Sequence, residues 1–162
     1  MNGLEILSCG LDDTNEYAVN IAKVLAPGDV IILEGSLATG KTQFVKMCCE
    51  ALDYKNLVTS PSYTVANFYS LGDFNIMHVD LYRIDNEYEF LEIGLDNYLE
   101  DSITFIEWGD KFQEYFADFM KIKFEFVDDS ENCRKLKLTI KGNKWIEKFT
   151  AIENNLNKRK IL

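Results

Sequence analysis

Residues 35–42 carry the pattern G-x-x-x-x-G-K-[ST], which is typical of loops that bind phosphate. Such a loop leaves a buried strand, here the apolar run 30–33, and leads into a helix. Its successive backbone N–H groups and the positive end of the helix dipole then face a phosphate chain. An ordinary glycine-rich turn is the alternative, and the preceding strand disfavours it. The predicted phosphate-binding residues are Gly35, Leu37, Ala38, Thr39, Gly40, Lys41 and Thr42.

Two acidic residues follow apolar runs that predict buried strands. Asp80 comes after residues 76–79, and Glu107 comes after residues 103–106. The carboxyl ends of parallel strands meet at one edge of a sheet, so both carboxylates are expected near Thr42, where they would orient Mg²⁺ and a water molecule during phosphate hydrolysis. A surface acid beyond a strand is the alternative for either alone. We predict Asp80 and Glu107 as catalytic residues, and both with Thr42 as magnesium ligands.

The segment 60–64, Ser-Pro-Ser-Tyr-Thr, lies between the loop helix and Asp80. Many phosphate-loop proteins carry here a hydroxyl that senses the terminal phosphate, and Thr64 is the candidate. Plain turn chemistry of the Ser-Pro pair explains the segment equally well. His78 is expected to be a sheet residue with its ring hydrogen-bonded, rather than an acid or base. Trp108 either covers the site or packs in the core.

Arg83 has two possible roles. It could supply positive charge to a transition state, as arginine fingers do, or pair with Glu87 four residues later. The pair is favoured.

The hydrophobic pattern predicts the elements that position these residues. Predicted helices alternate with predicted strands. The inward face of the helix at 13–25 includes Tyr17, Ala18, Ile21, Val24 and Leu25, and that of the helix at 41–52 includes Phe44, Cys48, Ala51 and Leu52. This alternation predicts an α/β chain with a three-layer P-loop NTPase-like fold, a mixed, mainly parallel central sheet and β-hairpin additions. The predicted helical segments are 13–25, 41–52, 87–91, 95–99 and 144–156, and the predicted strands are 30–34, 63–69, 75–80, 103–106, 120–127 and 136–141.

The composition is that of an ordinary globular protein. The 162 residues, 47% of them hydrophobic, are expected to form a single P-loop ATPase domain over 1–162. Apolar stretches fall far short of the ~20 residues of a membrane span, and the N-terminus, with Glu5 and no basic flank, is not typical of a signal peptide. We therefore expect a cytoplasmic protein. Without a C-x-x-C pair, the cysteines are expected to be core thiols: Cys9, Cys48, Cys49 and Cys133.

The formal net charge of −10 disfavours direct binding of nucleic acid, whose affinity depends on Lys and Arg neutralising phosphates. Any connection to RNA is expected to be indirect. The basic cluster 158–160 is interpreted as a solubilising chain end, with a partner contact as the alternative.

Taken in order, these motifs resemble the TsaE family, formerly YjeE, of small bacterial P-loop ATPases that support threonylcarbamoyladenosine formation in tRNA. The resemblance rests on the order and spacing of five segments, which are Gly-x-Leu-x-x-Gly-Lys-Thr at 35–42, Ser-Pro-Ser-Tyr-Thr at 60–64, His-x-Asp-Leu-Tyr-Arg at 78–83, Glu-Phe-Leu-Glu-Ile-Gly-Leu at 89–95 and Ile-Glu-Trp at 106–108.

The resemblance implies an ATPase that binds Mg²⁺ with ATP and assembles with the TsaD and TsaB proteins, which transfer the threonylcarbamoyl group to tRNA. Contact with tRNA is then indirect, and no membrane is involved. Thr42 and Glu107 match the family's metal-binding residues, and Asp80 and Thr64 match other active-site positions. Thr14 and Arg134 match residues near the nucleotide. Ser36, Ala38 and Thr39 depart from the commoner Gly-Asp-Leu-Gly-Ala-Gly-Lys-Thr form, and a left-handed Ala38 would strain the loop by roughly 1 kcal/mol.

Three other functions compete with this interpretation. A nucleotide or metabolite kinase closes an arginine-bearing lid, and the three arginines Arg83, Arg134 and Arg159 are too far apart in the sequence to build one. A GTPase carries Asn-Lys-x-Asp, whereas residues 143–146 lack the aspartate, so adenine is favoured. A module that binds nucleotide without hydrolysing it, only to order a docking surface, is the third.

Overall fold

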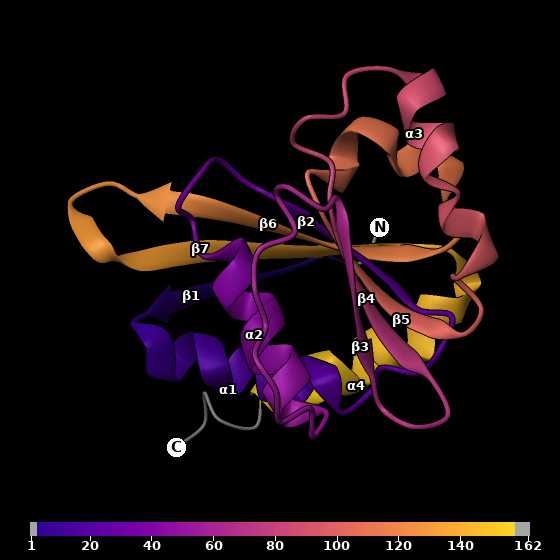
Figure 1. Ribbon diagram of the computed structural model, residues 1–162. Helices are drawn as coiled ribbons and strands as arrows, with labels where there is room; N and C mark the ends of the chain where they lie inside the picture. Colours follow the sequence, from indigo (N-terminus) through magenta and orange to yellow (C-terminus); the bar gives the residue numbers. More distant parts are fainter. Residues whose placement is uncertain (1–2, 158–162) are drawn as a thin grey trace.

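The computed structural model describes residues 3–157, which form an α/β fold around one mixed sheet of seven strands (Figure 1). The strand order across the sheet is β1-β7-β6-β2-β5-β4-β3. The strands are β1 Gly3–Cys9, β2 Val30–Glu34, β3 Ala66–Ser70, β4 Asn75–Asp80, β5 Ser102–Glu107, β6 Phe119–Val127 and β7 Ser130–Lys141. The helices are α1 Leu11–Ala22, α2 Lys41–Ala51, α3 Glu87–Ile93 and α4 Ile146–Asn157, with 3₁₀ turns η1 Leu95–Asn97, η2 Gly109–Tyr115 and η3 Asn143–Trp145.

Half of the strand pairings are parallel, which corrects the expectation of a mainly parallel sheet. β2 pairs in parallel with β5 and β6, and β4 pairs in parallel with β5. The other three pairings, β1 with β7, β3 with β4 and β6 with β7, are antiparallel. The two predicted hairpins account for two of these, because a short turn can join only antiparallel neighbours. The parallel pairings lie toward the centre of the sheet. There β2, which leads into the loop, lies beside β5, which ends at Glu107, and β5 lies beside β4, which ends at Asp80.

The helical layers cover the two faces of the sheet unequally (Figure 1). Helices α1, α2 and α4 lie on one face, where their apolar side chains pack on alternate residues of the strands. On the other face, α3, η1 and η2 pack mainly over β2, β4 and β5 and reach the first residues of β3 and β6, Ala66 and Phe119. The remaining part, over β6 and β7, carries Lys–Glu pairs such as Lys123 with Glu125 and Lys137 with Glu125. The predicted three layers are therefore present over half of the sheet.

Most predicted elements have their expected type and approximate bounds. Strand β2 begins and ends as predicted, and Phe44 and Cys48 of α2 are fully buried. Ala51 is exposed, since α2 turns its last residue away from the sheet. Strand β1 was absent from the sequence prediction, although its residues alternate in burial as an edge strand should.

A disulfide joins Cys9 to Cys133, which corrects the prediction that all four cysteines are core thiols. The two residues are direct neighbours in the antiparallel register of β1 and β7, with Cα atoms 4.0 Å apart. Only Cys48 and Cys49 remain as buried thiols within residues 3–157. Burial raises the pKa of Cys49 to about 12 and that of Cys48 well above its usual value, so both stay protonated and unreactive.

Reduction of this disulfide should destabilise the protein. It closes a loop between residues 124 positions apart, so reducing it restores conformational freedom to the unfolded chain. We expect the free energy of unfolding to fall by about 2–4 kcal/mol. Urea denaturation with and without a reducing agent measures this difference. A Cys9→Ser/Cys133→Ser variant should be as unstable as the reduced protein and insensitive to the reducing agent; equal midpoints for the oxidised and reduced wild type would contradict the expectation.

The part of the chain that the structure describes has no helix with the length and apolar character needed to cross a membrane. The basic cluster 158–160 lies outside the described residues.

Candidate nucleotide site

The loop between β2 and α2 is closely packed against β6. Gly35 has φ of 150°, and a Cβ added there would lie 2.7 Å from the Phe124 carbonyl oxygen, so only glycine fits. Ala38 has φ of 63°, which is the left-handed conformation that the sequence analysis associated with a strained loop. The Thr39 hydroxyl donates to the Ser36 carbonyl oxygen across the turn. The loop is thereby held in one curved shape before α2 begins at Lys41.

The Lys41 side chain lies inside the loop and is almost fully buried. Its ammonium donates to the carbonyl oxygens of Gly35 and Ser36 and lies 4.3 Å from the centre of the Trp108 ring. Burial lowers the pKa of Lys41, and the carboxylates of Glu107 and Asp80 raise it in turn. A cation is thus concentrated at the N-terminus of α2, whose free N–H groups add to the positive potential.

Strands β2, β4 and β5 bring the two predicted acids together. Glu107 lies between Leu33 of β2 and Asp80 of β4 in the parallel register. Alternation along the strands turns Asp80 and Glu107 to the face that α2 covers. The Thr42 hydroxyl in the first turn of α2 lies 2.9 Å and 3.0 Å from the two carboxylate oxygens of Glu107 and donates to them. Residues 65 positions apart therefore meet at the loop.

His78 is fully buried beside Glu107. Its Nε2 lies 2.6 Å from Glu107 Oε2, and its Nδ1 lies 3.4 Å from the Tyr69 hydroxyl. The expectation of a sheet residue with a hydrogen-bonded ring is confirmed, because His78 is part of β4 and both ring nitrogens have a neighbour.

The Ser-Pro segment reaches the site through a different hydroxyl from the one predicted. Ser62 donates to Asp80 Oδ2 at 3.1 Å, and Ser60 and Ser62 line the same cavity as Lys41. The Thr64 hydroxyl instead donates to Asn67 Oδ1, and its side chain is exposed outside this cavity. The sensor role of Thr64 stays a prediction, and it would require the segment to move.

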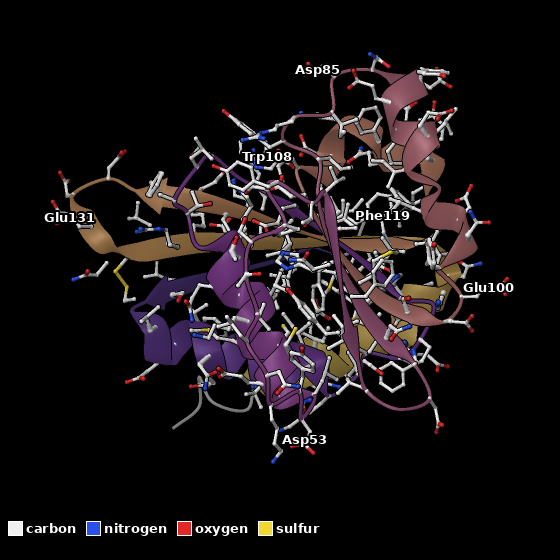
Figure 2. The ribbon with its side chains drawn as sticks, in the orientation of Figure 1. Asp53, Asp85, Glu100, Trp108, Phe119 and Glu131 are labelled. Atoms are coloured by element: carbon white, nitrogen blue, oxygen red, sulfur yellow. A yellow bond between two sulfur atoms is a disulfide. The ribbon has the colours of Figure 1, made fainter. Side chains whose placement is uncertain are left out.

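Trp108 lines the cavity directly after β5, where it is labelled in Figure 2. Its φ of 61° is rare outside glycine and turns the indole back over Lys41, so covering the site is the better interpretation. The Tyr82 ring also packs against the indole, with ring centres 5.0 Å apart. Arg83 lies over the Tyr63 ring, and the expected ion pair with Glu87 is not formed within residues 3–157.

A second cavity adjoins the first along the loop, with Ala38, Thr39 and Gly40 lining both. The structure brings Thr14 of α1 and Arg134 of β7 into it, although 120 residues separate them in sequence. Arg134 lies over the Phe126 ring, and its Nε is buried without a hydrogen-bond partner. The site thus has a charged half around Lys41 and a half that mixes apolar and polar groups around Thr14. The apolar residues that line the half around Thr14 are Leu11, Ala38, Phe124 and Leu136.

The residues of the charged half fit Mg²⁺ in type. Thr42 and Glu107 offer hydroxyl and carboxylate oxygens, the hard ligands that Mg²⁺ prefers, and Asp80 lines the same cavity. Within residues 3–157, no group of three His, Cys, Asp or Glu side chains is arranged to hold a metal by itself. Sites that bind Mg²⁺ through one or two carboxylates and substrate phosphates need no such group. A magnesium site here would therefore need oxygen ligands from a bound phosphate chain as well.

Three contacts of the site were missed by sequence reasoning. Ser62 had a weak signal, since it lies in the Ser-Pro segment that was singled out for Thr64. Phe124 closes the loop through its backbone, which no side-chain pattern reveals. Lys111 donates to the carbonyl oxygens of Leu81 and Tyr82 and so holds the segment after Asp80.

Comparison with known proteins gives a consistent result. A family model described as "Threonylcarbamoyl adenosine biosynthesis protein TsaE" matches residues 10–136. Two proteins named "tRNA threonylcarbamoyladenosine biosynthesis protein TsaE" are similar to the chain. The one from Streptomyces coelicolor is 33% identical over 80% of this chain and 92% of its own length. The one from Bacillus subtilis is 32% identical, over 83% of this chain and 84% of its own.

A solved structure also has the same fold. The crystal structure of Bacillus subtilis YdiB aligns with a TM-score of 0.78 and 25% identity, covering 94% of this chain and 95% of the other. The matched residues 10–136 contain both the loop and the acids at the ends of β4 and β5.

Proposed function

The chain belongs to the TsaE family, whose members act in forming threonylcarbamoyladenosine in tRNA, and on this premise we propose that it is a magnesium-dependent ATPase. In this proposal it binds and hydrolyses ATP to support the TsaD and TsaB proteins. Those proteins transfer the threonylcarbamoyl group to tRNA, and this chain does not make that bond.

One observation carries the proposal: the Thr42 hydroxyl meets the Glu107 carboxylate beside the buried Lys41 ammonium. Phosphate hydrolysis needs a cation on the terminal phosphates and oxygen ligands for Mg²⁺. Lys41 is placed for the first task, once it exchanges the carbonyl oxygens of Gly35 and Ser36 for phosphate oxygens. Thr42 and Glu107 are suited to the second, and bound Mg²⁺ would supply charge neutralisation at the β- and γ-phosphates. Asp80, with Ser62 as its donor, is suited to orienting the attacking water.

Adenine is the base that the surroundings favour. The cavity around Thr14 and Arg134 is next to the loop and large parts of its lining are apolar, as a base requires. The segment 143–146, the nearest approach to a guanine-reading motif, lies at the opposite end of β2. There Lys144 donates to the Gly28 carbonyl oxygen and pairs with Asp29 at 3.2 Å. It is therefore unable to read a base bound at the loop.

Titration with nucleotides tests the proposal. The sequence has two tryptophans; Trp145 is fully buried in the core, and Trp108 contacts Lys41. We expect ATP with Mg²⁺ to change tryptophan emission as Lys41 leaves the indole. The GTP concentration that gives half of this change should be at least about tenfold higher than that of ATP, because a mismatched base leaves roughly one hydrogen bond unmade. Phosphate release measured on the same samples should be slow for the chain alone and faster with TsaD and TsaB. A Trp145→Phe variant is the control that should keep the signal.

Three results would contradict the proposal. The chain could fail to bind either nucleotide, prefer GTP, or transfer the phosphate to a metabolite instead of water. Binding without phosphate release, even with TsaD and TsaB present, would favour the module that binds nucleotide and does not hydrolyse it.

A further inference from the structure

A chain of hydrogen-bond contacts runs from Thr59, the residue before the Ser-Pro segment, to the proposed magnesium ligand. The Tyr69 hydroxyl lies 3.1 Å from the Thr59 carbonyl oxygen and 3.4 Å from His78 Nδ1. His78 Nε2 lies 2.6 Å from Glu107 Oε2, and Glu107 accepts from Thr42. Three elements, β3, β4 and β5, contribute one side chain each, so the contacts cross the sheet beneath α2.

Burial makes each of these contacts matter. His78 is fully buried, so water cannot replace a lost partner of its ring, and Glu107 is only 4% exposed. A carboxylate only accepts hydrogen bonds, so its contact with His78 requires a proton on Nε2. Burial also raises the pKa of Tyr69, and its single hydroxyl hydrogen can be donated either to the Thr59 carbonyl oxygen or to His78 Nδ1. The imidazole therefore holds Glu107 Oε2, which fixes the carboxylate with both of its oxygens facing the Thr42 hydroxyl.

We propose that His78 is a positioning residue for Mg²⁺ binding, which orients Glu107 and links it through Tyr69 to the segment that begins at Thr59. This inference rests on the proposed function. A metal-binding carboxylate needs a fixed orientation, and losing the outer hydrogen bond of a metal ligand typically lowers metal affinity about 10- to 100-fold. Without His78, the Glu107 carboxylate loses its 2.6 Å contact with the imidazole and keeps those with Thr42, so its orientation is less constrained.

The alternative role of His78 is packing alone. It shares its face of the sheet with Ile76 and Phe105, which belong to the core under α2. A packing role predicts a loss of stability and a general loss of affinity for nucleotide. The positioning role predicts that nucleotide affinity changes only when Mg²⁺ is present. This difference separates the two roles.

Binding of a fluorescent ATP analogue, measured in EDTA and across a Mg²⁺ series, tests the inference on the full chain. We expect His78→Leu to raise the Mg²⁺ concentration at half-saturation about tenfold or more, with binding in EDTA unchanged. His78→Gln retains an N–H donor and should recover most of the Mg²⁺ dependence. Tyr69→Phe should shift it less, in the same direction. Thr104→Val is the matched control, since it removes a buried, unpartnered hydroxyl on the opposite face of β5.

The wild type and the variants answer different questions. If Mg²⁺ does not affect nucleotide binding to the wild type, the proposed function and this inference both fail. If the wild type responds to Mg²⁺ and His78→Leu responds identically, or loses affinity equally in EDTA, only the inference fails. Should thermal melting show that His78→Leu is unfolded, Tyr69→Phe decides, and an unchanged Mg²⁺ series for that variant overturns the inference.

Discussion

Replacing Lys41 with alanine should abolish nucleotide binding. The ammonium is the cation at the centre of the loop, and it also holds the carbonyl oxygens of Gly35 and Ser36. Each charge-assisted hydrogen bond to phosphate is worth about 1.5–3 kcal/mol, so losing two lowers affinity by roughly 100-fold or more. Isothermal titration with ATP and Mg²⁺ measures the loss.

Lys46→Ala is the matched control for this variant. Lys46 is on the same helix, α2, and lines neither cavity of the site, so its removal changes net charge equally without touching the loop. Because Lys41 is buried, thermal melting must accompany the titration. A folded Lys41→Ala protein that binds ATP as tightly as Lys46→Ala would contradict the assignment of the loop.

Replacing Glu107 with glutamine should separate binding from hydrolysis. Glutamine has nearly the same shape, and its carbonyl oxygen at the Oε2 position can still accept from Thr42 and His78, but it lacks the negative charge that Mg²⁺ requires. The Lys41 contacts with phosphate remain, so ATP affinity should stay within a few-fold of wild type. Phosphate release should fall by about 100-fold or more, as when an electrostatic contact of the transition state is removed.

Asp101→Asn provides the comparison for Glu107→Gln. Asp101 immediately precedes β5, at the end of the strand that is remote from the loop, and is exposed. Both variants remove one carboxylate next to the same strand. Phosphate release should be unchanged in Asp101→Asn, measured with TsaD and TsaB present. Equal rates in the two variants would show that Glu107 has no part in hydrolysis.

The Lys41 and Glu107 variants therefore test two different functions of the charged half of the site. Loss of binding in the first variant and loss of turnover in the second would establish that nucleotide capture and hydrolysis depend on separate groups. Loss of binding in both would instead indicate that Glu107 is needed to keep Thr42 and the first turn of α2 in place.

The elements around the loop could be predicted because their signals are local. Alternation and helical spacing extend over five to twelve residues, and glycine marks the turns between them. The bounds of β2 and the start of α2 at Lys41 followed from such signals. The positions of Asp80 and Glu107 at strand ends followed as well, and parallel neighbours bring such ends together.

Contacts between distant segments needed the tertiary structure. Cys9 faces Cys133, and Thr14 shares a cavity with Arg134, only because β1 pairs with β7 in one register. The Ser62 hydroxyl, rather than that of Thr64, reaches Asp80 because of the path of a loop with no periodicity to predict it.

The sequence alone determined which residue types could do chemistry here, since a phosphate loop and acids after apolar runs are patterns within short segments. The tertiary structure decided how those residues are supported: the segment around His78 does not show which side chain its ring contacts. Its place beside Glu107 depends on the pairing of β4 with β5. Strand register depends on the burial of side chains across the whole sheet, and a short stretch of sequence does not determine that burial.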